Sequence, residues 1–229
     1  MGSKERQDRE RQSVREAILT AARELFVQEG YRHVSMRKIA DRIEYSPAAI
    51  YSYFPSKDDI FWALAEEGFQ RMSEIAAPLL AEDRDPLEAL RECFWLYYRF
   101  SREQPQYFEL MFVDRTVPQI SRDWERIGYV RELMDGAAGL VRRATAAGQL
   151  PPDTNADVAF HLLWAAVHGP AVLAVCDRLD PREDADALAR DTLEAALTGL
   201  RHGFPTTFIP EHCPVVRAGS AGESRNVAS

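Results

Sequence analysis

The stretch Ser35–Lys57, S-M-R-K-I-A-D-R-I-E-Y-S-P-A-A-I-Y-S-Y-F-P-S-K, predicts two short helices joined by a tight turn. Each half carries its own N-cap, because the hydroxyl oxygens of Ser35 and Ser46 can accept hydrogen bonds from free backbone N–H groups in the first turn. Pro47 fits the first helical position, where its missing N–H costs nothing and its φ is already helical. Apolar residues of the first half share one face, and charged residues lie opposite.

The second half of this stretch predicts a helix with an unusual outer face. Ile50 and Phe54 point inward at helical spacing. The residues at or near the outer side are small, hydroxylated or aromatic: Pro47, Ala48, Ala49, Tyr51 and Ser52. A helix with so few acidic groups on its outer side can lie close against DNA. The stretch is therefore interpreted as a helix-turn-helix.

This segment resembles the DNA-binding motif of the tetracycline-repressor (TetR) family of bacterial transcription regulators. The family motif often reads S-P-A-A-I-Y, then an aromatic or histidine pair, then lysine, as in Ser46–Phe54 and Lys57 here. Two positions depart from it. Glu44 stands where the turn often has glycine, so it is strained if the turn needs a positive φ. Tyr53 stands where histidine is frequent.

The resemblance implies how this motif would contact DNA. Arg37 would reach a base edge or a phosphate, Pro47–Ala49 would touch bases or thymine methyl groups, and Tyr51, Tyr53 and Lys57 would hold phosphates. The whole set of predicted DNA-binding residues is Ser35, Arg37, Ser46, Pro47, Ala48, Ala49, Tyr51, Ser52, Tyr53 and Lys57.

Composition indicates an ordinary globular protein. The chain is 46% hydrophobic and 28% charged. Its 229 residues are enough for one large domain or two modest ones. No apolar run reaches the roughly 18–20 residues of a membrane helix, and the charged first residues do not resemble a signal peptide, so a cytoplasmic location is expected. Cys93, Cys176 and Cys213 are widely spaced without a C-x-x-C pair, which predicts reduced cysteines rather than a disulfide or zinc framework.

Charge is distributed unevenly along the chain. The net charge is −8, yet residues 1–57 hold 11 Lys/Arg against 8 Asp/Glu, and the remainder holds 17 against 28. A basic segment on an acidic body suits DNA binding, because phosphate affinity depends on local charge. A solvated charged face would give the same count.

The rest of the chain predicts an all-α fold, since no alternating strand pattern occurs. Residues 1–12 are predicted to be a flexible arm, either merely disordered or adding phosphate contacts through Arg6, Arg9 and Arg11. Further helices are expected from Ser13 to Gly30 and at 57–80, 86–101, 104–113, 119–147, 155–177 and 183–201. The predicted domains are a DNA-binding domain at 13–57, a ligand-binding and dimerisation domain at 58–203, and a disordered tail at 204–229.

Aromatic residues are dense between residues 94 and 112, a pattern typical of a core and also of an apolar ligand pocket with a few polar groups. Trp164–Gly169, W-A-A-V-H-G, resembles TetR-family C-terminal domains that carry a Trp–His–Gly signature. The predicted ligand-binding residues are Trp95, Tyr98, Arg99, Tyr107, Phe108, Phe112, Trp164 and His168. His161 and His168 are interpreted as hydrogen-bonded side chains rather than metal ligands, because no nearby Cys, Asp or Glu completes a coordination sphere.

The last two predicted helices, 155–177 and 183–201, suit dimer formation, because a small-residue face lets helices approach closely. In the family the analogous helices form a four-helix bundle across a two-fold axis. Two heads related by symmetry could read half-sites in successive major grooves, about 34–36 Å apart.

These observations predict a ligand-responsive, homodimeric repressor of a near-palindromic operator, released by a small hydrophobic or aromatic effector that tilts the 57–80 helix. No cofactor, metal or membrane partner is expected. Two alternatives stay open. One is an enzyme, although the sequence offers no nucleophile–base spacing, phosphate loop or metal motif. The other is a dimeric ligand carrier or interaction module without specific DNA binding.

Overall fold

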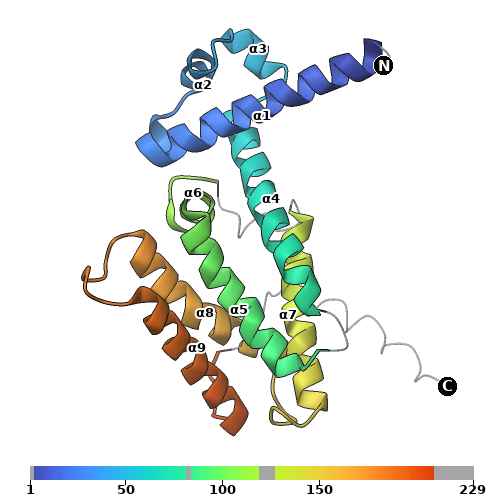
Figure 1. Ribbon diagram of the computed structural model, residues 1–229, viewed down its shortest axis with the longest axis vertical. Helices are drawn as coiled ribbons and strands as arrows, with labels where there is room; N and C mark the ends of the chain where they lie inside the picture. Colours follow the sequence, from blue (N-terminus) through green and yellow to red (C-terminus); the bar gives the residue numbers. More distant parts are fainter. Residues whose placement is uncertain (1–2, 81–83, 119–126, 209–229) are drawn as a thin grey trace, which may run out of the picture. The chain divides into compact units, whose positions relative to one another are not determined.

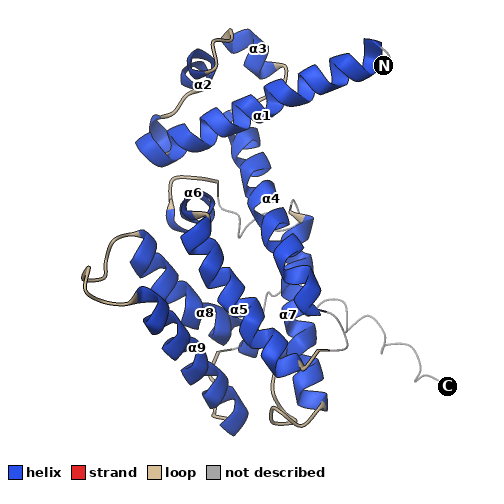
Figure 2. Ribbon diagram, in the orientation of Figure 1, coloured by secondary structure: helices blue, strands red, loops and turns tan. Residues whose placement is uncertain are grey.

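The computed structural model describes residues 3–80, 84–118 and 127–208. Every regular element in these ranges is a helix (Figure 2), as the all-α prediction required. The described residues form two compact units: residues 3–70 with 103–118, and residues 71–80, 84–102 and 127–208. Each unit is considered by itself below.

The first unit contains α1 (Ser3–Glu29), the 3-10 turn η1 (Tyr31–His33), α2 (Met36–Arg42), α3 (Pro47–Tyr51) and the first fourteen residues of α4 (Lys57–Ala76). It also contains α6 (Pro105–Phe108) and the π-helical turn η3 (Glu109–Val113), both packed against α1. In Figure 1, α2 and α3 form a pair beside α1. Its fully buried side chains include Ile18, Ala22, Ile39, Ile50, Phe61 and Phe108.

The expectation that the first helix begins at Ser13 was wrong, because α1 already begins at Ser3. The side chains of residues 4–13 are all exposed, so no apolar stripe announces this part of the helix. Its composition of Arg, Glu and Gln favours helix by propensity alone. The side chain of Gln12 also donates a 2.9 Å hydrogen bond to Glu16, one turn further on.

The second unit contains η2 (Ala77–Leu80), α5 (Pro86–Glu103) up to Arg102, α7 (Gly128–Ala146), α8 (Ala156–Val175) and α9 (Ala185–His202). α8 packs against both α7 and α9. By length and composition α8 alone, among the described helices, could cross a membrane, a test that core helices of soluble proteins also pass.

Several predicted boundaries shift. The expected 57–80 helix ends as α4 at Ala76 and continues as the 3-10 turn η2, which contains Pro78. The expected 104–113 helix divides into α6 and the π turn η3, and the expected 119–147 helix appears as α7 from Gly128, with residues 119–126 outside the described ranges. Residues 204–208 of the predicted tail form no helix, and residues 209–229 lie outside the described ranges.

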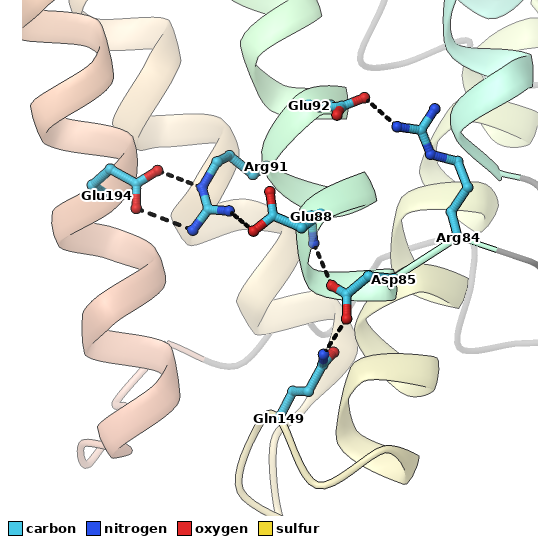
Figure 3. A network of polar contacts seen from close by, with 7 residues as sticks. All are labelled: Arg84, Asp85, Glu88, Arg91, Glu92, Gln149 and Glu194. Atoms are coloured by element: carbon cyan, nitrogen blue, oxygen red, sulfur yellow. Dashed lines mark hydrogen bonds and ion pairs between the residues drawn. The ribbon is translucent and has the colours of Figure 1, made fainter.

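A polar network holds the start of α5 in the second unit (Figure 3). The guanidinium of Arg91 on α5 donates to both carboxylate oxygens of Glu194 on α9, at 2.5 and 3.3 Å, and also pairs with Glu88. Asp85 accepts hydrogen bonds from the Glu88 backbone N–H and from the side chain of Gln149. These contacts fix the register of α5 against α9 and the loop after α7.

Candidate functional site

Two serine caps start the paired helices of the first unit. Ser35 Oγ accepts a 3.2 Å hydrogen bond from the backbone N–H of Lys38 at the start of α2. Ser46 Oγ accepts an equal bond from Ala49 at the start of α3, where Pro47 occupies the first turn. Both predicted caps are confirmed, and their side chains lie exposed at the ends of the helices.

The turn between α2 and α3 requires a left-handed residue. Glu44 has φ 59°, and the turn is closed by hydrogen bonds from the N–H of Glu44 to Asp41 O at 3.3 Å and from the N–H of Tyr45 to Ala40 O at 3.0 Å. This is the Schellman pattern that commonly uses glycine. The turn does need a positive φ at this position, so Glu44 is strained as expected. A side chain at such a φ costs about 1–2 kcal/mol.

The outward face of α3 agrees with the pattern read from the sequence. Ile50 is fully buried and Phe54 is 4% exposed, whereas Tyr51 is 53% exposed. Pro47, Ala48 and Ser52 are exposed and Ala49 is half-buried. The Ser52 hydroxyl donates a 2.6 Å bond to the carbonyl of Ala49, so its hydrogen is used inside the helix while its oxygen still faces outward.

Two arginines of α1 lie against the aromatic residues that follow α3. The guanidinium carbon of Arg11 is 5.8 Å from the ring centroid of Tyr53, and that of Arg15 is 5.1 Å from the Phe54 ring. On α2, the side chain of Arg37 is 82% exposed and only 3.8 Å from Asp41, a weak surface pair that leaves the guanidinium able to reach outward.

Lys57 is positioned differently from the other predicted phosphate contacts. Its ammonium donates to the carbonyl oxygens of Tyr31 and Val34, at 2.7 and 3.1 Å, and lies 4.0 Å from the Tyr31 ring centroid. Desolvation lowers its pKa. Because an ammonium has three N–H donors, these two bonds leave one for a phosphate.

Three of the predicted ligand-binding residues lie in the first unit. The Tyr107 hydroxyl accepts a hydrogen bond from Arg23 of α1, whose guanidinium also lies over the Tyr107 ring at 4.8 Å. Phe112 packs edge-on against Phe69 of α4, with ring centroids 5.8 Å apart, and contacts Phe108 at 5.1 Å. These residues therefore join α6 and η3 to α1 and α4.

A second aromatic cluster in the second unit joins α5 to α8. Tyr97 Oη and His168 Nδ1 are 2.7 Å apart, and the Trp164 ring lies 5.3 Å from His168. Phe160 extends the cluster, with its ring 6.4 Å from Trp164 and 5.8 Å from Phe94. Burial lowers the pKa of His168 and raises that of Tyr97, so both groups are held neutral, and the tautomer of the imidazole sets which of them donates the hydrogen bond.

Tyr97 and Phe160 belong to this cluster but not to the predicted ligand set, although Tyr97 lies in the aromatic run of α5. Their contacts join α5 to α8 through tertiary packing, which the pattern of a single sequence does not report. His161, by contrast, bonds its own helix through Asp157 O at 2.7 Å. Among the described residues no group of three His, Cys, Asp or Glu side chains could hold a metal ion.

Trp95, Tyr98 and Arg99 complete the predicted set, and the first two lie toward α9. The Trp95 ring stacks on Tyr98 at 5.0 Å and lies 4.7 Å from the Arg190 guanidinium. Tyr98 is fully buried and donates a 2.7 Å hydrogen bond to Asp186. Arg99 is exposed on α5. Within the second unit, Trp164 and His168 thus belong to the cluster between α5 and α8, whereas Trp95 and Tyr98 lie toward α9.

Both halves of the chain are similar to known regulators. Residues 18–64 match the bacterial regulatory proteins of the tetR family, and residues 90–196 match the tetracyclin repressor-like C-terminal domain. The chain is 29% identical to the HTH-type transcriptional repressor AcnR of Corynebacterium diphtheriae, over 84% of this chain and 94% of that protein. It is 33% identical to the HTH-type transcriptional repressor Rv1474c of Mycobacterium tuberculosis, over 63% and 73%.

The fold also resembles solved structures. The chain of the SmeT–triclosan complex superposes with a TM-score of 0.69 at 22% identity, covering 88% of this chain and 99% of that one. This likeness concerns the fold alone. The narrower resemblance to C-terminal domains with a Trp–His–Gly signature stays a prediction.

Proposed function

The chain belongs to the TetR family of DNA-binding transcription regulators, and from this premise we propose that it is a homodimeric cytoplasmic repressor released from its operator by a small aromatic or hydrophobic effector. The observation that carries the DNA part is the outer face of α3. Buried Ile50 and Phe54 hold the helix while Pro47, Ala48 and Tyr51 stay exposed. We expect no catalytic turnover, because regulators of this family act by binding.

The proposed contacts divide by role. Arg37 would read a base edge, because its guanidinium is almost fully exposed and can form a bidentate contact with guanine. Tyr51 and the one remaining N–H donor of Lys57 would hold phosphates, together with Arg11 beside Tyr53. Two such heads in a dimer would read the two halves of a near-palindromic operator.

The test is a fluorescence-anisotropy titration of the purified protein against duplexes from the DNA flanking its own coding region, with random duplex as competitor and salt varied. Binding should weaken steeply with salt and prefer one near-palindromic duplex. Arg37→Ala should cost about 1–3 kcal/mol on that duplex and relax its specificity. Tyr51→Ala should weaken binding to all sequences alike.

Two results would contradict this proposal. Equal loss on selected and random DNA for Arg37→Ala would remove its base-reading role. Absence of any preference for one duplex at any salt would favour the alternative of a ligand carrier with the same fold.

The effector part of the proposal is supported by the cluster of Tyr97, Trp164 and His168. It combines large rings with one hydrogen-bonded polar pair, the composition of a site that binds an apolar ligand and orients it through a single polar group. SmeT, solved with triclosan, shows that this fold accommodates an aromatic ligand. Such an effector would act only if it binds the DNA-free conformation more tightly.

A panel of hydroxylated aromatics and acyl chains, screened for release of the labelled operator, would test this site. Tyr97→Phe and His168→Ala should raise the concentration of an active compound needed for release, with DNA affinity unchanged in its absence. Unchanged release curves for both variants would place the effector elsewhere.

A further inference from the structure

Tyr45 occupies a position in the turn that ordinarily packs inward. In a Schellman motif, the residue after the left-handed position commonly makes a hydrophobic contact back to the preceding helix. Here Glu44 is the left-handed residue and Tyr45 follows it, with its N–H bonded to Ala40 O. Yet the Tyr45 side chain is 44% exposed, so much of its ring stays in contact with water.

The exposed ring of Tyr45 lies next to the residues that begin the outward face of α3. Tyr45 directly precedes Ser46, the cap of α3, and exposed Pro47 and Ala48 follow. In the described part of the first unit, only Tyr45 and Tyr51 are large apolar side chains that are exposed. The flanking helices α1 and α2 carry none. They stand at the two ends of the outward face of α3, so any surface against which α3 lies would also meet Tyr45.

We propose that Tyr45 is a specificity-determining residue whose ring contacts a thymine C5-methyl group at the edge of each half-site. This inference rests on the proposed DNA-binding function and adds a base contact to it. The major groove presents the methyl group only at thymine, and an apolar side chain recognises it by contact. The backbone bonds of the turn hold the Tyr45 backbone beside the start of α3, so its side chain leaves the chain next to the outward face of that helix.

Base contact and phosphate contact predict different results. A ring on a thymine methyl adds affinity only for sequences with thymine at that position, whereas a hydroxyl on a phosphate adds affinity for every sequence. Tyr45→Phe keeps the ring and removes the hydroxyl, so it is the matched control. Tyr45→Ala removes both, and thermal unfolding of the two variants checks that the turn still folds.

The experiment first selects a preferred duplex for the full-length protein from a randomised library. Thymines of each half-site are then replaced one at a time by deoxyuridine, which lacks only the methyl group. At one position per half-site, the replacement should weaken binding of the unsubstituted protein by about fourfold, the value of one buried methyl group. Tyr45→Phe should respond in the same way, and Tyr45→Ala should not respond at that position.

Each other outcome is decisive. If Tyr45→Ala binds the selected duplex as tightly as the unsubstituted protein, Tyr45 makes no contact and the inference is wrong. If it loses affinity equally for selected and random duplexes, or if Tyr45→Phe shares its loss, the contact is to phosphate. If the unsubstituted protein selects no duplex at all, the proposed function itself fails, which is a separate result.

Discussion

At the scale of single residues, Glu44 carries strain at the turn of the helix-turn-helix. Its φ of 59° suits glycine, which lacks the Cβ that makes this region unfavourable. Glu44→Gly should therefore stabilise the protein by about 1 kcal/mol, although the greater freedom of glycine in the unfolded chain offsets part of the gain. Chemical denaturation would measure the difference.

Glu44→Ala is the matched control for this prediction, because it removes the carboxylate and keeps the Cβ. It should leave stability nearly unchanged if backbone strain is the cause. Equal stabilisation by alanine and glycine would assign the effect to the charge of Glu44 instead.

Individual residues also show how far the sequence predicts the site. The caps Ser35 and Ser46 and the inward positions Ile50 and Phe54 follow from local rules, because capping and helical periodicity act within one turn. Lys57 differs, since its ammonium bonds carbonyl groups more than twenty residues earlier in the chain. Such a contact depends on tertiary packing, which no local pattern reports.

At the scale of elements, Gly68 of α4 allows η3 to approach closely within the first unit. A Cβ added at Gly68 would lie 2.4 Å from the sulfur of Met111 and 3.3 Å from the Tyr107 ring. In Gly68→Ala, overpacking should cost about 1–3 kcal/mol, and the higher helix propensity of alanine should return roughly 1 kcal/mol of this. We therefore expect a net destabilisation of the protein. Urea unfolding would give the net change.

Gly139 of α7 provides the comparison. A Cβ there would meet only the end of the Arg142 side chain, at 3.9 Å. Gly139→Ala should stabilise the helix by its propensity alone. Stabilisation by both substitutions would mean that Met111 moves aside at little cost and that α4 and η3 are not tightly joined.

Asp85 is the N-cap of α5, where its carboxylate accepts the backbone N–H of Glu88 (Figure 3). Two hydrogen bonds lower the pKa of Asp85 below its ordinary value of 3.8, first that from the Glu88 backbone N–H and then that from the Gln149 side chain. The folded protein thus favours the charged carboxylate, and this stabilisation is present above the unfolded-state pKa and is lost as the pH falls through the folded-state pKa. Asp85→Ala should lower the melting temperature at pH 7.

The difference between Asp85→Ala and the unsubstituted protein should narrow as the pH falls below about 4, where the carboxylate of the unfolded chain takes up a proton. Asp85→Asn keeps an oxygen that can accept the Glu88 N–H, so its difference at pH 7 should be smaller, but it should narrow by the same amount as the pH falls, because neither variant titrates at this position. A gap for Asp85→Ala that stays constant down to acid unfolding would contradict the assignment.

The elements that were predicted least accurately share a physical reason. The first ten residues of α1 have no apolar stripe, and η3 is a π turn whose irregular spacing hides the helical period. Hydrophobic periodicity identifies helices that pack on one side, such as α5 and α9. It does not identify a solvent-exposed helix or a turn shaped by a close contact such as that between Gly68 and Met111.

At the scale of the whole molecule, α8 is strongly apolar but only partly buried within the chain. Only 33% of its most apolar 18-residue stretch is buried. Leu173 of α8 and Leu188 of α9, which packs on it, are each 37% exposed. A second copy of α8 and α9 would cover these exposed leucines, so we expect this side of the helix pair to be the subunit contact.

Leu173→Glu should therefore convert the proposed dimer into a monomer, because association would bury an unpaired carboxylate. Sedimentation velocity would measure the oligomeric state. Operator affinity should fall about 100-fold or more, since joining two binding modules gains roughly 10²–10⁴ in affinity over one.

Ile75→Glu, on an α4 residue that is 47% exposed, is the control and should stay dimeric. A dimer of undiminished affinity for Leu173→Glu would show that the exposed side of α8 is not the subunit contact, and a monomer that still binds the operator tightly would separate dimerisation from DNA recognition.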